Sequence, residues 1–157
     1  MKALHASKGR KSAAEFIAEG RAAVLAALAS KRYPVVSLYV TESGAELLPQ
    51  SALNRAIYLS EKVMAAISTV ESAQGVLAIC AMNREIDPNH VGEIFQRVQL
   101  PLIYCFEVND PGNLGTIIRT ADALGSAGVL LSPGSADPFS PKVVRSTAGS
   151  LWHVPVL

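Results

Sequence analysis

Residues 101–132 contain the pattern strand, turn, helix, strand, which points to an α/β architecture. Residues 101–108 are a short apolar run and predict a buried strand. Asp110-Pro111-Gly112 then predicts a turn, because proline fixes φ and glycine tolerates positive φ. Apolar residues recur at helical spacing over 114–124, and 128–132 reads as a second strand. We therefore expect a strand-helix-strand unit that packs its helix on a parallel sheet.

The turn before this helix is a candidate binding site. We expect Asn113 to cap the helix with its side-chain oxygen. Free N–H groups at a helix N-terminus, directly after a buried strand, suit an anion or a polar ligand. Many α/β proteins carry a glycine-containing turn here that binds nothing, so the local pattern leaves both possibilities open.

Arg119 lies off the apolar stripe of the predicted helix, close to Thr116 and Asp122. One interpretation is a surface arginine that pairs with Asp122. The other is a guanidinium fork near the turn that holds a phosphate. The helical spacing alone is compatible with either role.

The first hundred residues also alternate between strands and helices. Strands are predicted at 16–17, 35–41, 56–60 and 75–82, and helices at 21–29, 61–68 and 91–98. Beyond residue 131 we expect a loop over 132–140 and a short helix that ends at Gly149, which would be its C′ glycine. The alternation predicts a mostly parallel α/β protein with a module boundary near residue 100.

Composition agrees with a globular chain. Of the 157 residues, 50% are hydrophobic and 17% are charged, which suits one domain with a buried core. There is no secretory signal pattern and no apolar run of membrane-spanning length, so we expect a soluble, cytoplasmic protein. Cys80 and Cys105 lie in apolar runs and are expected as packed free thiols. The three histidines are scattered, and no metal site is predicted.

Charge is unevenly distributed although the net charge is only +1. Residues 1–32 carry seven basic side chains against two acidic ones, while the other 125 residues carry seven against eleven. A basic N-terminal arm fits a phosphate-binding patch. It also fits a solvated, partly disordered start, and the charge count does not separate the two.

The sequence around the turn resembles the first motif of the SpoU/TrmH family of RNA ribose 2′-O-methyltransferases. Six positions match that motif: Asn113, Gly115, Arg119, Thr120, Ala121 and Gly125. Residues 137–156 resemble the next stretch of the family, in which an Asp, a Pro-Lys and an Arg precede a small-residue turn and a hydrophobic-Pro-hydrophobic strand. Phe16, Glu19-Gly20 and Gln74-Gly75 look like parts of the family's N-terminal substrate-binding domain.

The resemblance implies a small α/β RNA substrate-binding domain over 1–100, followed over 101–157 by the first part of an α/β SPOUT-type methyltransferase domain. Family members transfer a methyl group from S-adenosylmethionine to a ribose 2′-hydroxyl of rRNA or tRNA, usually as homodimers. The resemblance makes Arg119 the catalytic candidate and Asn113 its motif partner. Because guanidinium stays protonated in proteins, we expect Arg119 to clamp a phosphate and stabilise the developing alkoxide.

Four basic residues are candidates for RNA contact. Lys142 and Arg145 lie three apart on the short helix, where they would share one face. That face could equally be a solvated surface. Arg10 and Lys11 belong to the basic N-terminal segment. By resemblance only, Ser146 and Gly149 are expected near the active site.

The family's later motifs do not occur in this sequence. The resemblance places the cofactor site in a C-terminal trefoil knot built from a Gly-Glu segment and a Ser-x-Asn-Val segment, and neither occurs after Val154. We therefore assign no cofactor-binding residue and expect the 157-residue chain to be an inactive portion of an enzyme. We also expect Leu151, Trp152, Val154 and Val156 to be exposed. The alternatives are, from another class, a non-catalytic RNA-binding module and, third, an unrelated nucleotide-binding α/β domain.

Overall fold

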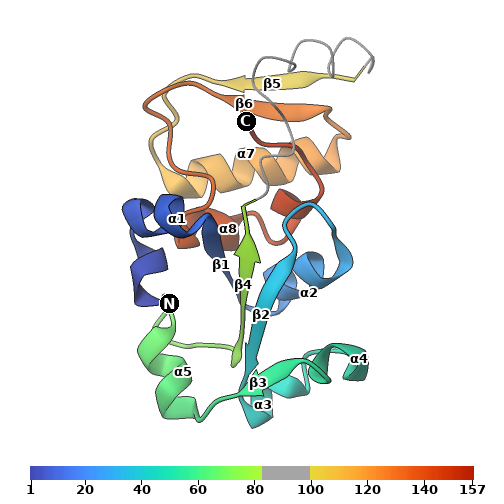
Figure 1. Cartoon of the computed structure of the whole chain (residues 1–157). Helices are drawn as coiled ribbons and strands as arrows, with labels where there is room; N and C mark the ends of the chain where they lie inside the picture. Colours follow the sequence, from blue (N-terminus) through green and yellow to red (C-terminus); the bar gives the residue numbers. More distant parts are fainter. Residues whose placement is uncertain (83–99) are drawn as a thin grey trace.

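The computed structural model describes residues 1–82 and 100–157, which fold around two sheets (Figure 1). The first part consists of η1 (Lys2–His5), α1 (Ser7–Ala13), β1 (Glu15–Glu19), α2 (Arg21–Ala29), β2 (Val35–Val40), α3 (Glu42–Ala45), α4 (Gln50–Leu53), β3 (Ala56–Tyr58), α5 (Glu61–Ile67) and β4 (Val76–Ala81). The second part consists of β5 (Leu102–Cys105), α7 (Pro111–Ala123), β6 (Gly128–Leu131), α8 (Pro141–Ser146) and η3 (Ser150–Trp152). The strands and helices expected within these residues are confirmed, with ends shifted by a few residues. The helix expected at 91–98 lies outside the described residues.

The first sheet has the strand order β1-β4-β2-β3, and β4 runs antiparallel to both of its neighbours. Only the β2–β3 pairing is parallel. The expectation of a mostly parallel sheet is therefore wrong for this part of the chain. The alternation of strand and helix does make β1, β2 and β3 point the same way, but β4 arrives last and inserts between β1 and β2 in the opposite direction.

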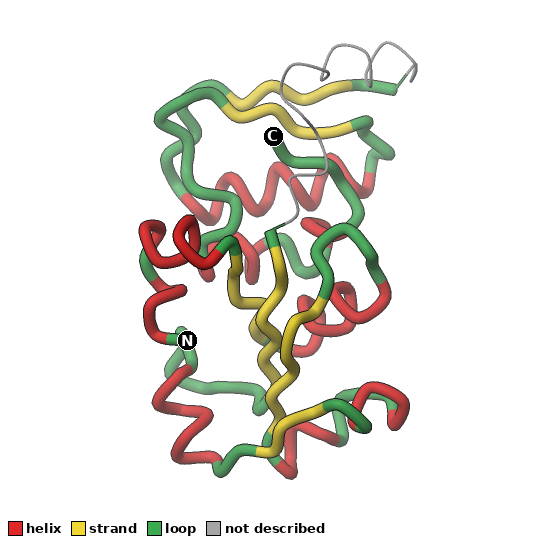
Figure 2. Tube along the Cα trace, viewed as in Figure 1, coloured by secondary structure: helices red, strands yellow, loops and turns green. Residues whose placement is uncertain are grey.

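The second sheet is parallel, as expected. β5 pairs with β6 in register from Leu102 opposite Gly128 to Cys105 opposite Leu131. The end of the chain extends this sheet on the other side of β6, where the Val129 N–H donates to the Pro155 carbonyl (2.9 Å) and the Leu157 N–H donates to the Val129 carbonyl (3.0 Å). The loops after β5 and β6 therefore leave the sheet on the same side, next to α1 (Figure 2).

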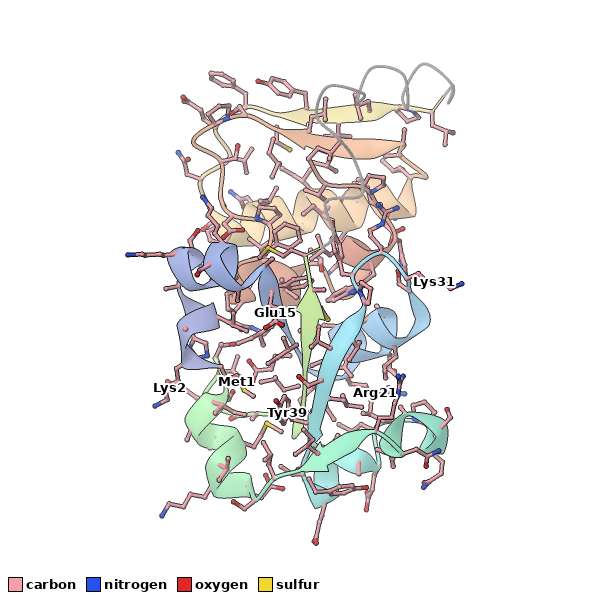
Figure 3. The ribbon with its side chains drawn as sticks, in the orientation of Figure 1. Met1, Lys2, Glu15, Arg21, Lys31 and Tyr39 are labelled. Carbon is pink, nitrogen blue, oxygen red and sulfur yellow. The ribbon has the colours of Figure 1, made fainter. Side chains whose placement is uncertain are left out.

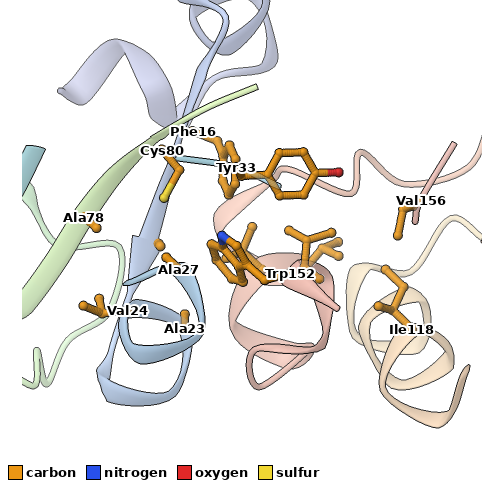
Figure 4. Close-up of a cluster of buried hydrophobic side chains, with 14 of the residues drawn as sticks. Phe16, Ala23, Val24, Ala27, Tyr33, Ala78, Cys80, Ile118, Trp152 and Val156 are labelled. Carbon is orange, nitrogen blue, oxygen red and sulfur yellow. The ribbon is translucent and has the colours of Figure 1, made fainter. Parts of the chain in front are cut away.

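One hydrophobic core joins the two parts of the chain. The ring of Phe16 on β1 contacts that of Phe139, with the ring centroids 5.0 Å apart. It also contacts Trp152 at 5.8 Å and Tyr33, which packs edge-on against it at 5.5 Å (Figure 4). Helix α8 packs on one side against β1 and on the other against α7. The second part thus provides a covering layer for the first sheet.

The expected exposure of the last residues is wrong. Leu151 is fully buried, and Trp152, Val154 and Val156 are at most 7% exposed. The reason is that the chain after α8 turns inward, so that Trp152 enters the core beside Phe16 and Val156 joins the second sheet. The exposed large apolar side chains among the described residues of this part are instead Leu100, Leu102, Tyr104 and Phe106, on and beside β5, and Leu124 at the end of α7.

Both cysteines are buried and free, as the sequence predicts. Burial raises the pKa of the Cys80 thiol to about 12 and also raises the pKa of the Cys105 thiol. Cys80 lies in the central strand β4 and Cys105 at the end of β5. Each thiol therefore acts as a small apolar side chain in its own sheet.

Candidate functional site

Helix α7 starts two turns before Arg119 and begins earlier than the sequence suggested. Its N-cap is Asp110, whose carboxylate accepts a hydrogen bond from the Asn113 N–H (2.8 Å), and Pro111 occupies the first helical position. Asn113 is therefore not the cap, as we expected, because the Asp-Pro pair supplies a stronger start signal three residues upstream. The Asn113 side chain is exposed in the first turn, where its amide is available to a ligand.

Arg119 lies exposed on α7, one helical turn from Asp122. The suggested pair with Asp122 does not form, because the Asp122 carboxylate lies 2.9 Å from Nδ1 of His153. Within residues 1–82 and 100–157, Arg119 has no hydrogen-bond or ion-pair partner. Its guanidinium can therefore bind an incoming anion without first breaking an internal contact in this part of the chain.

Close packing of α7 on α8 fixes the position of this helix. Gly115 is buried at the contact, and a Cβ added to it would lie 1.8 Å from Oγ of Ser146. The Ser146 hydroxyl lies 2.9 Å from the Val143 carbonyl and 3.3 Å from the Pro111 carbonyl at the start of α7. Ser146 thus contacts the helix that carries Asn113 and Arg119.

Lys142 and Arg145 do not form one basic face. Lys142 is exposed. Arg145 is half-buried and turns toward the first part of the chain, where its Nη1 donates to Oγ1 of Thr69 and lies 4.0 Å from a carboxylate oxygen of Glu19. The two side chains therefore belong to different surroundings although they are three residues apart.

Arg10 and Lys11 also separate. Arg10 is 3% exposed and donates to the Asp137 carboxylate (2.6 Å) and to the carbonyls of Leu4 and His5 (2.9 and 2.8 Å). Its charge stabilises the loop after β6, which leaves it unsuited to contact RNA. Lys11 is exposed and, together with residues 131–138 of that loop, lines a cavity of about 280 Å³.

Sequence reasoning missed the polar cluster around Glu19. This carboxylate is 94% buried and accepts hydrogen bonds from the Ser68 and Thr69 hydroxyls and from the Thr69 N–H (3.0 Å). Glu19-Gly20 and Gln74-Gly75 were recognised only as family resemblances, and no local pattern linked them to Thr69 or Arg145. A charged residue followed by glycine at the end of a buried strand was the available signal.

Comparison with known proteins connects this arrangement to a family. The sequence model of the SpoU rRNA methylase family matches residues 101–157, and that of the MRM3-like substrate-binding domain matches residues 1–78. Residues 101–157 belong to the SpoU rRNA methylase family. Helix α7 lies within the first of these ranges, and the second range is matched by a domain described as substrate-binding.

Relatives align with nearly the whole chain. The 23S rRNA (guanosine(2553)-2′-O)-methyltransferase RlmP of Bacillus subtilis is 35% identical over 99% of this chain and 59% of its own length. The AdoMet-bound rRNA methyltransferase of Sinorhizobium meliloti is 32% identical with a TM-score of 0.77, over 99% of this chain and 58% of that one. The AdoMet complex of the SpoU methyltransferase AviRb from Streptomyces viridochromogenes has 26% identity, a TM-score of 0.79 and the same coverage. The chain thus spans less than two thirds of each of these relatives.

Among residues 1–82 and 100–157, no helix is both long and apolar enough to cross a bilayer. In the same ranges, no three His, Cys, Asp or Glu side chains are grouped as metal ligands would be.

Proposed function

We propose that this SpoU-family chain is the RNA-facing portion of an RNA 2′-O-methyltransferase that acts on rRNA or tRNA. The observation that carries the proposal is Arg119, which is exposed on α7 with no partner among the described residues, while the neighbouring carboxylate of Asp122 is held by His153. An exposed guanidinium on α7 with no internal partner among the described residues suits a phosphate of RNA. The relatives named as rRNA methyltransferases support the same class of reaction.

In this proposal the two parts of the chain have different roles. Residues 1–100 bind the RNA substrate and residues 101–157 begin the methyltransferase domain. Lys11, Lys142 and Arg145 contact RNA, whereas Arg10 holds the loop after β6. We further propose a cytoplasmic enzyme that works as a homodimer.

The proposed chemistry is an in-line displacement. S-adenosylmethionine would supply a methyl group on a sulfonium. As the ribose 2′-oxygen bonds to the methyl carbon, the carbon–sulfur bond would break and S-adenosylhomocysteine would leave. Arg119 holds the neighbouring phosphate and stabilises the negative charge that develops on that oxygen. Asn113, exposed in the first turn of α7, orients the ribose through its amide. Guanidinium does not accept the hydroxyl proton, so the proton leaves to water or to another group.

A chimaera tests the reaction. Residues 1–157 would be joined to the C-terminal part of the S. meliloti rRNA methyltransferase that lies beyond the aligned region, and methyl transfer from labelled S-adenosylmethionine to rRNA would be measured. We expect activity that falls by about 100-fold or more in Arg119→Gln. Lys31→Gln is the control, because it removes an exposed charge that is assigned no RNA contact, and it should retain most of the activity.

Binding by the 157-residue chain, taken together with the activity of the chimaera, distinguishes the alternatives. RNA binding by residues 1–157 together with an inactive but folded chimaera would favour a non-catalytic RNA-binding module. Tight binding of a free mononucleotide without RNA binding would favour an unrelated nucleotide-binding domain. Either result would overturn the methyltransferase proposal.

A further inference from the structure

A cavity of about 360 Å³ lies where α2, the segment before β4 and α8 meet. Its walls come from both parts of the chain, and they include Glu19, Arg21, Val70, Gln74, Arg145 and Ala148. The cavity therefore lies on the boundary between the proposed RNA-binding part and the proposed methyltransferase part. Its volume is large enough for a nucleotide-sized group.

Two arginines, Arg21 and Arg145, line this cavity, and the side chain of Arg145 is held in place. Arg145 donates through Nη1 to the Thr69 hydroxyl, which in turn donates to the buried Glu19 carboxylate. This chain of hydrogen bonds fixes the Arg145 side chain while its other N–H groups remain available. Arg21 is exposed at the start of α2, at the opposite end of that helix from Lys31 (Figure 3).

The Glu19 carboxylate, 4.0 Å from Nη1 of Arg145, offsets only one of these two positive charges. Its oxygens already accept three hydrogen bonds from Ser68 and Thr69, and the side chain is almost fully buried. The carboxylate therefore acts as an internal support for Thr69 and Arg145. The two arginines leave the accessible lining with a positive charge, which favours an anionic ligand.

The backbone at the start of α2 adds donors of the same kind. Gly20, at φ 89, lets the chain turn from β1 into α2, and a Cβ there would lie 3.1 Å from Oε1 of Gln74. That same Gln74 oxygen accepts the Arg21 N–H (2.8 Å). The N–H groups of Ala22 and Ala23 belong to the first turn and have no partner inside the helix. Both residues line the cavity.

We propose that this cavity binds a phosphate of the RNA strand, with Arg21 and Arg145 as its two cationic contacts and Val70 and Ala148 against the attached nucleoside. The inference rests on the proposed function, because it names the ligand as part of an RNA. It adds a subsite away from Arg119, on the other side of α8. Arg145 lines the cavity, and the next residue, Ser146, packs against Gly115 of α7. The short helix α8 therefore supports both the subsite and α7.

The test measures binding of a random-sequence pool of fluorescein-labelled RNA oligonucleotides to the 157-residue chain by anisotropy. Arg21→Gln should weaken binding by about tenfold, as expected for the loss of one charge-assisted phosphate contact. It should also lower the slope of log K against log salt by about 0.7. Lys31→Gln removes the same charge at the other end of α2 and should change neither quantity by more than about twofold.

Arg145→Gln should weaken binding to a similar extent, and thermal unfolding would show whether loss of the Thr69 contact also destabilises the chain. Arg21→Gln keeps the proposal testable if Arg145→Gln does not fold. Equal effects of Arg21→Gln and Lys31→Gln would overturn the subsite, as would displacement of the RNA by micromolar AMP or inorganic phosphate, which would identify a free phosphate compound as the ligand. If the wild-type chain binds no RNA, the proposed function fails as well, whereas wild-type binding that Arg21→Gln leaves unchanged overturns this inference alone.

Discussion

The two sheets differ in how their faces are covered. In the first sheet the central strand β4 is buried from Val76 to Cys80, and α8 of the second part helps to cover its neighbour β1. In the second sheet, β5 leaves Leu102 39% exposed and Tyr104 62% exposed. The chain therefore buries β1 and β4 of its first sheet with its own residues, although Val36 on β2 and Ile57 and Tyr58 on β3 stay exposed. The outer face of β5 stays open among the described residues. Stability should accordingly be sensitive to core changes near β1 and insensitive to changes on the outer face of β5.

The arginines of the two parts show the same difference. Arg10, in the first part, is buried and neutralised by Asp137. Arg119, in the second part, is exposed and has no partner among the described residues. A charge that is used internally stabilises the fold, whereas an unpaired exposed charge is available for a ligand. The substitutions below test this division.

The largest effect is expected from Trp152→Ala. Trp152 carries the second part of the chain into the core beside Phe16, so truncation should lower the free energy of unfolding by about 3–5 kcal/mol. Urea denaturation measures the loss, and hydrogen exchange should show lower protection in β1 and β4. Trp152→Phe is the control and should cost less than about 1.5 kcal/mol, because the indole N–H has no partner among the described residues. Unchanged protection of β1 would mean that the two parts do not share a core.

Arg10→Met should have the next largest effect, about 2 kcal/mol, because it leaves Asp137 without its cation. The value lies below that of a fully buried pair since Asp137 keeps 29% exposure. Thermal or urea unfolding measures it, and Lys11→Met, at the exposed neighbour, should stay within about 0.5 kcal/mol. Arg10→Met combined with Asp137→Asn should cost less than the sum of the single changes. Strict additivity would argue against a coupled pair.

Cys80, in the central strand of the first sheet, should make the free energy of unfolding depend on pH. The pKa of Cys80 is about 12 in the folded chain and about 9 in an ordinary thiol, so above pH 9 the unfolded chain ionises first. The stabilising contribution of Cys80 is therefore complete below pH 9 and falls by about 1.4 kcal/mol for each pH unit between 9 and 12. The stability difference between wild type and Cys80→Ala should shrink by that amount from pH 8 to pH 10. No shrinkage would show that Cys80 ionises freely in the folded chain.

Sequence periodicity was enough to locate most of the strands and helices. It could not give the position of β4, because the insertion of a last strand between β1 and β2 depends on pairing between distant residues. Nor did it indicate that Trp152 and Val156 are buried. Trp152 packs against Phe16, which lies far away in the chain, and Val156 pairs with Val129 of β6.

The candidate site was predictable to a similar degree. The turn before α7, helix α7 itself and the exposed position of Arg119 follow from local sequence patterns. The charge count could not distinguish the buried Arg10 from the exposed Lys11, because the partner of Arg10 is Asp137, 127 residues later. Likewise, helical spacing suggested that Asp122 would hold Arg119, but His153 binds that carboxylate through a tertiary contact.

The smallest effect is expected on the open face of the second sheet. Tyr104→Thr keeps a residue that favours strands and removes a ring that is largely in solvent, so the free energy of unfolding should change by less than about 0.5 kcal/mol. Ile103→Thr on the same strand is the matched change, and it should cost more because Ile103 packs against the core. Urea unfolding of the two variants compares the faces directly. A loss for Tyr104→Thr as large as that for Ile103→Thr would mean that the outer face of β5 is covered in solution, and the contrast between the two sheets would then disappear.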